Sequence, residues 1–136
     1  MLPILVTTGD WAADLCNDYF VARVSGHDIR ILKREAGGDR SIVVEPKVVE
    51  VGFDSRYILA KRFETHFWSP DRPNATGLPD STKVSYFIID TKRHVVHGPM
   101  NKQAFSAKKT VLRVPEATTL TDVGKLKKNP EVNTIQ

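Results

Sequence analysis

Residues 84–99 read VSYFIIDTKRHVVHGP, and this stretch decides the fold class. Residues 84–89 form the most apolar run of strand-forming residues in the chain, so we expect a β-strand at the centre of a sheet. Asp90 opens a turn, because its carboxylate can accept hydrogen bonds from backbone amides just after it. Residues 94–97 predict the return strand, which makes the stretch an antiparallel hairpin.

Strand signals continue on the N-terminal side of this hairpin. Alternation places Phe20, Ala22 and Val24 on one face of a strand, and it points Ile29 and Ile31 of the next strand inward. Residues 11–15 predict a helical turn or an irregular lead-in. The expected strands before residue 84 are 18–24, 29–34, 41–44, 48–51 and 56–62.

The periodicity changes after residue 100. Asn101 can cap a helix over residues 102–112, in which Phe105 and Leu112 form an apolar stripe. The stems of Lys108 and Lys109 would flank this stripe. The sequence therefore predicts an α+β fold, mostly β, with a single antiparallel β-meander of six or seven strands and one C-terminal helix packed on it.

Pro115 ends the predicted helix and marks the expected boundary of the domain. We expect residues 1–115 to form one β-rich domain, including a helix over 101–113. Residues 116–136 are predicted to be a basic, partly disordered C-terminal tail.

Composition narrows the class of protein. The chain has 136 residues, 40% of them apolar, and a single cysteine, Cys16, which excludes an internal disulfide. No apolar run approaches the ~18 residues of a membrane span. The apolar start of the chain lacks the basic region of a signal peptide. The default location is the cytoplasm, or the periplasm or cell surface if a signal peptide has been removed.

No residue pattern indicates catalysis. Nucleophile-elbow, P-loop and dinucleotide-binding motifs are absent from the sequence. His94 and His97 would point to opposite faces of a strand, so they cannot bind one metal ion together. Asp10, Asp14 and Asp18 are better explained by capping and turns. We expect a non-enzymatic protein without a metal site or cofactor.

The aromatic and proline-rich segment 63–82 is the long connection in a chain of tight turns, and it contains HFWSPDRPNATGLPDS at 66–81. Long connections of this kind are often functional. Trp68 and Arg72 are residue types enriched in binding hot spots, and the ring of Phe67 is costly to leave in water, so we expect these three residues to contact a protein partner. An inhibitor or immunity-type protein is one subtype. The alternative is that Phe67 and Trp68 fold back over the core as a lid.

Basic residues concentrate in the last third of the chain. Residues 91–136 contain nine Lys or Arg and three Asp or Glu, which gives a net charge of +6. Lys108 and Lys109 on the predicted helix, together with the basic tail, give the alternative prediction of a nucleic-acid-associated protein. A solvated helix followed by a lysine-rich tail would explain the same charges.

Three segments resemble a family of small bacterial domains of unknown function, over about residues 48–115. They are KVVEVGFDSRYILAKR at 47–62, YFIIDTKRHVVHGP at 86–99 and NKQAFSAKKTVLRVPE at 101–116. The pattern is an aromatic-Asp strand end, an R-Y-I-L-A strand, a Y-F-I-I-D-T strand and a Gly-Pro turn before a helix. The resemblance implies lipoprotein-like relatives and a shared fold, and it transfers no catalytic residue.

Overall fold

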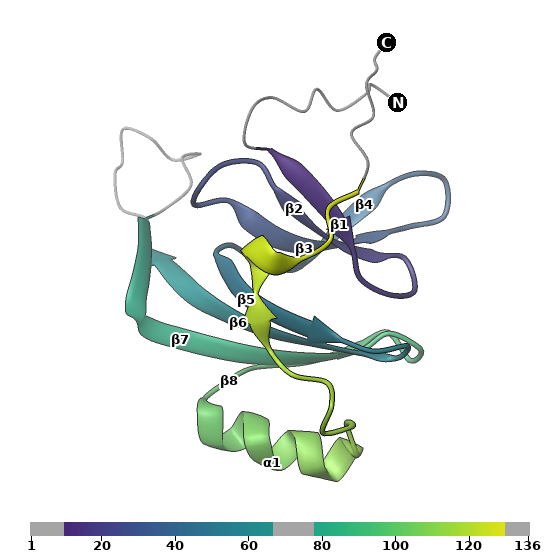
Figure 1. Cartoon of the computed structure of the whole chain (residues 1–136), viewed down its shortest axis with the longest axis vertical. Coiled ribbons are helices and arrows are strands. Elements are labelled where there is room, and N and C mark those ends of the chain that lie inside the picture. The colour runs from purple at the N-terminus through teal and green to yellow at the C-terminus, as the bar shows by residue number, and fades with distance from the viewer. Residues whose placement is uncertain (1–9, 67–77, 130–136) are drawn as a thin grey trace.

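The computed structural model describes residues 10–66 and 78–129, which form two antiparallel sheets and one α-helix (Figure 1). The N-terminal sheet has the order β1-β2-β3-β4, with β1 at Trp11–Asp14, β2 at Tyr19–Arg23, β3 at Ile29–Arg34 and β4 at Arg40–Val44. The central sheet has the order β8-β7-β6-β5-β9. Its strands are β5 at Val48–Phe53, β6 at Tyr57–His66, β7 at Leu78–Asp90, β8 at Val95–Met100 and β9 at Thr121–Asp122.

The mostly β content and the antiparallel pairing confirm the predicted class, but the prediction of a single meander is wrong. The chain changes sheets between β4 and β5, at Pro46 and Lys47. Lys47 exchanges two backbone hydrogen bonds with Phe63 of β6, and the Arg62 guanidinium donates to the Pro46 carbonyl. These bonds fix the crossing, so β5 pairs with β6 rather than with β4.

The two sheets face each other across one apolar core. Both contribute fully buried side chains to it, among them Val21 and Ile31 from the N-terminal sheet and Val51, Ile58 and Ile89 from the central sheet. The inward residues of β2 are Tyr19 and Val21, so the face that carries Phe20, Ala22 and Val24 points away from the core. Ile29 and Ile31 point inward as predicted.

Helix α1 at Lys102–Leu112 covers the other face of the central sheet (Figure 1). Its limits and its Asn101 cap agree with the prediction, because the cap side chain accepts from the Ala104 amide at 2.8 Å. Phe105 is the buried residue of the helix and stacks on Tyr86 with 4.9 Å between ring centroids. The central sheet is therefore covered on both faces where α1 and the N-terminal sheet pack on it, which explains the buried apolar runs at residues 57–60 of β6 and 87–89 of β7.

Two segments differ from their sequence-based expectations. Residues 11–14 form strand β1 at the edge of the N-terminal sheet, where Ala12 pairs with Ala22. The segment predicted as a tail is described as far as Asn129 and packs on both sheets. Its strand β9 pairs with β5, and Val123, which begins the 3-10 helix η1 at Val123–Lys125, is buried in the core.

Candidate functional site

Strands β6 and β7 continue beyond the rest of the central sheet as a two-stranded ribbon. Phe63 pairs with Val84, and Glu64, Thr65 and His66 then pair with Asp80, Pro79 and Leu78. The pairing of β5 with β6 ends at Arg62, and that of β8 with β7 ends at Tyr86. We call residues 64–66 and 78–83 the arm. Among the described residues, no other strand pairs with it.

The arm is bent where three extra residues, 81–83, interrupt its register. Asp80 accepts hydrogen bonds from the Thr82 amide at 2.9 Å and from the Thr82 hydroxyl at 2.6 Å, which closes this bulge into a compact turn. A bulge bends a strand and increases its local twist, so the two sides of the bulge point in different directions. Figure 1 shows β7 turning away from the central sheet and rising beside the N-terminal sheet.

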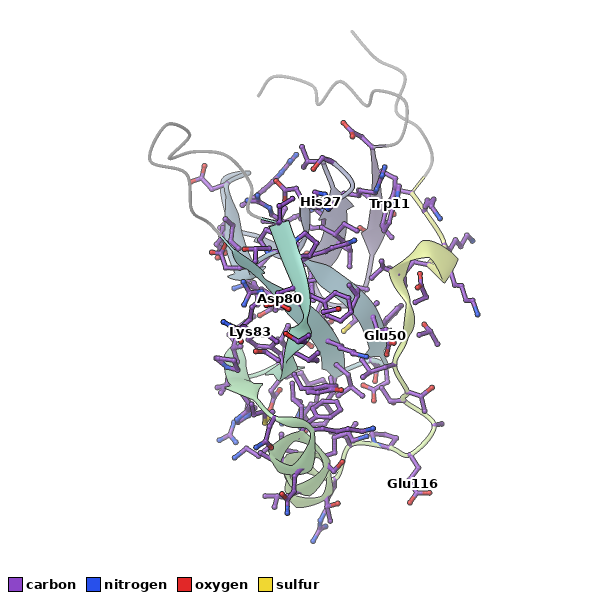
Figure 2. All side chains as sticks on the ribbon, turned by 90° about the vertical axis from the view of Figure 1, so that its left-hand side faces the viewer. Trp11, His27, Glu50, Asp80, Lys83 and Glu116 are labelled. Carbon is purple, nitrogen blue, oxygen red and sulfur yellow. The ribbon has the colours of Figure 1, made fainter. Side chains whose placement is uncertain are left out.

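Exposed groups lie along the arm. Leu78 is 63% exposed, and Ser81, Thr82 and Lys83 are exposed on the bulge. The arm is attached to the central sheet by Ser85, whose hydroxyl donates to the Glu64 carboxylate at 3.0 Å. Figure 2 shows Asp80 and Lys83 on the side of the molecule that carries β7, between Trp11 at one end and Glu116 at the other.

The predicted connection 63–82 is too long, because residues 63–66 belong to β6 and residues 78–82 belong to β7. The sequence pattern did not indicate the start of β7, because Pro79 and the three-residue bulge interrupt the alternation expected of a strand. The predicted binding residues Phe67, Trp68 and Arg72 lie outside the described residues, so the choice between a binding segment and a lid stays a prediction.

The predicted basic residues lie in two separate regions. Lys108 and Lys109 are half-buried on α1, where the Lys109 ammonium lies 4.8 Å from the centroid of the Phe105 ring. Lys128 lies at the other end of the molecule, with its ammonium 5.1 Å from the Trp11 ring (Figure 2). Helix and tail therefore do not form one continuous basic patch.

Polar side chains at the turns of the sandwich hold the sheets together. The Asn17 amide donates to the Ser55 carbonyl at 2.9 Å and to the Thr91 hydroxyl at 2.8 Å. Burial raises the pKa of the neighbouring Cys16 thiol, which keeps it protonated and opposes its use as a nucleophile. Within residues 10–66 and 78–129, no three His, Cys, Asp or Glu side chains are grouped to hold a metal ion.

The fold defines a class: a small two-sheet β-sandwich with a helix on the outer face of one sheet and a bent two-stranded arm. The chain belongs to a family described as a protein of unknown function, DUF3997, whose sequence model matches residues 16–124. This confirms the resemblance to a family of unknown function and extends it in both directions. No curated protein and no solved structure matches the chain. In the part of the chain that the structure describes, no helix is long and apolar enough to cross a membrane.

Proposed function

We propose that this protein is a non-enzymatic binding module of a bacterium that engages a protein partner through the arm and the connection it carries. The observation behind the proposal is the ribbon that continues past both neighbouring strands, so that no third strand of the described chain is added to it. A two-stranded ribbon alone is marginally stable in water. A partner that adds a strand or apolar surface to the arm would therefore stabilise it.

The chemistry of recognition comes from the backbone. An unpaired strand edge presents N–H and C=O groups that another chain can extend by adding a strand. Leu78 supplies exposed apolar surface beside that edge, and the bulge closed by Asp80 and Thr82 fixes its direction. An inhibitor or immunity-type protein is the subtype we favour, since such proteins are small, single-domain and free of catalytic motifs.

Site-specific photocrosslinking tests this proposal. A photoreactive phenylalanine analogue is placed at Leu78 in one variant and at Val111 of α1 in another. Val111 is a matched control because it is similarly exposed, at 71%. In cells, the Leu78 variant is expected to give a discrete covalent adduct with one protein, and the Val111 variant is not. Equal adducts from both positions, or none from Leu78, would exclude the arm as the contact.

The second candidate function is association with nucleic acid through the basic helix and the C-terminal segment. It is supported by Lys108 and Lys109 on a helix that contains no acidic residue. Binding of a single-stranded oligonucleotide would then weaken steeply with salt. Replacing Lys108 and Lys109 by Gln in one variant, and Lys125, Lys127 and Lys128 in another, shows which region contributes. An oligonucleotide that fails to bind at low salt would exclude this candidate.

A further inference from the structure

A groove of about 480 Å³ separates the last turns of α1 from the segment after the helix. Residues from one face of the helix form the first wall, namely Ser106, Lys109, Thr110 and Arg113. Glu116 and Thr119 belong to the second wall. Glu116 lies at the far end of the molecule from Trp11 and apart from Asp80 and Lys83 of the arm (Figure 2).

Arg113 has an unusual backbone for its residue type. It ends the helix in the left-handed conformation, with φ 59° and ψ 42°, where glycine is the usual residue because a Cβ atom is unfavourable there. Left-handed residues other than glycine are enriched at functional sites. Arg113 and Lys109 both line the groove, and neither forms an ion pair with a carboxylate of the described residues.

The carbonyl groups at the end of a helix normally repel an anion, but here several already accept hydrogen bonds. The Arg113 amide donates to the carbonyls of Lys109 and Thr110, and the Val114 amide also donates to Lys109. The Tyr57 hydroxyl donates to the Leu112 carbonyl at 3.2 Å. These bonds reduce the negative potential that the helix end would present to the groove.

The second wall is held rigidly against the central sheet. The Thr118 hydroxyl donates to the Asp54 carboxylate at 2.8 Å. Burial raises the pKa of Asp54, yet hydrogen bonds from the Tyr57 and Arg56 amides and from Thr118 outweigh it and leave the pKa below its ordinary value. The chain then crosses Gly52 so closely that a Cβ atom there would clash with the Thr119 carbonyl oxygen.

The geometry points to a binding site for an oxyanion, a carboxylate or a phosphate group, between Lys109 and Arg113. The ammonium of Lys109 is positioned by the Phe105 ring, and the Arg113 guanidinium offers planar donors that match an oxyanion. Ser106 and Thr119, one on each wall, carry hydroxyl groups that can donate to the same anion. Glu116 on the rim opposes the anion and limits its affinity.

Titration of the ¹⁵N-labelled full chain with inorganic phosphate, and separately with glutarate, tests the site at constant ionic strength set by sodium chloride. Saturable shifts are expected for the amides of residues 110–119, with a dissociation constant on the order of 1 mM. Binding by phosphate alone or by glutarate alone identifies the chemical source of the oxyanion. Failure of both to saturate these amides overturns the proposal.

Variants separate binding from folding. Lys109→Gln and Arg113→Gly should each weaken binding about tenfold, whereas Glu116→Gln should strengthen it. Arg113→Gly should also raise the melting temperature, because glycine is favoured at this backbone conformation. Lys108→Gln, which removes a neighbouring charge that does not line the groove, should leave binding unchanged. Unaltered binding by Arg113→Gly, or equal weakening by Lys108→Gln, would contradict the assignment.

Discussion

The carboxylate of Asp90, at the turn between β7 and β8, accepts several hydrogen bonds. It accepts two hydrogen bonds from the Arg56 guanidinium, at 2.8 and 3.1 Å, and further ones from the amides of Lys92 and Arg93. The amide contacts confirm the Asx-turn predicted from the sequence. The Arg56 hydrogen bonds are the main reason that the pKa of Asp90 lies below its ordinary value of 3.8.

This lowered pKa makes stability depend on pH. Near pH 4 the unfolded chain holds more protons at this position than the folded protein does. The contribution of Asp90 is therefore present above the unfolded pKa and is lost as the pH falls through the folded pKa. Asp90→Asn should lower the free energy of unfolding by about 2 kcal/mol at pH 7, because the removed partner leaves Arg56 unpaired but partly solvated.

Urea denaturation at several pH values measures this effect. The stability of Asp90→Asn should decline less between about pH 5 and pH 2 than that of the unaltered protein. Asp39→Asn, at an exposed turn between β3 and β4, is the control and should behave like the unaltered protein. Parallel pH curves for Asp90→Asn and the unaltered protein would show that the Arg56 pair does not set the pH dependence.

Single residues also show where sequence patterns are ambiguous. Apolar residues occupy both faces of β2, so alternation could not decide which face points to the core. Phe20 lies on the outer face and is nevertheless buried, because the guanidinium groups of Arg34 and Arg40 lie 4.3 and 5.8 Å from its ring centroid. Arg113 was missed as a groove residue, since an arginine in the left-handed conformation leaves no pattern in the sequence.

At the scale of elements, α1 was predicted accurately because its signals are local. The Asn101 cap and the spacing of Phe105 and Leu112 depend on residues a few positions apart. The same spacing placed Lys109 beside the apolar stripe, where the structure finds its ammonium over Phe105. Strand β1 was missed because its pairing with β2 depends on residues that lie across the sheet.

Helix α1 is attached to the central sheet chiefly through the Phe105 side chain, so truncating this side chain should release the helix. Phe105→Ala removes the stack on Tyr86 and should lower the free energy of opening the helix by about 3 kcal/mol. Hydrogen exchange should accelerate at the amides of α1 much more than at those of β6. Val111→Ala, at an exposed position of the same helix, should have little effect. Equal acceleration in α1 and β6 would show that helix and sandwich unfold as one unit.

For the whole molecule, the pattern of the sequence did not reveal the division into two sheets. Apolar residues on both faces of a strand indicate burial on both sides, but they do not say whether a sheet or a helix covers each face. The chain order of the hairpins fits a meander equally well. The chain passes from one sheet to the other at Pro46 and Lys47, where it is held by hydrogen bonds with Arg62 and Phe63, which are distant in the sequence.

The segment after α1 packs on both sheets. A substitution in its buried part should therefore lower the stability of the whole protein, although it lies far from the arm and the groove. Val123 is 6% exposed and lies in the core shared by both sheets. Val123→Ala should lower the free energy of unfolding by about 2 kcal/mol, measured by urea denaturation. Val24→Ala, at a position 57% exposed, should change it by less than about 0.5 kcal/mol. Similar values for the two variants would contradict a structural role for this segment.

The Asn129 amide donates to the Ala12 carbonyl at 2.7 Å, so the two ends of the described chain lie side by side on the N-terminal sheet. Helix α1 is at the opposite end of the molecule (Figure 1). A tether that joins the described chain at either end would therefore leave from the N-terminal sheet, on the side of the molecule opposite α1. Immobilising the protein through one terminus and then through the other should present the same helical surface to the surrounding solution.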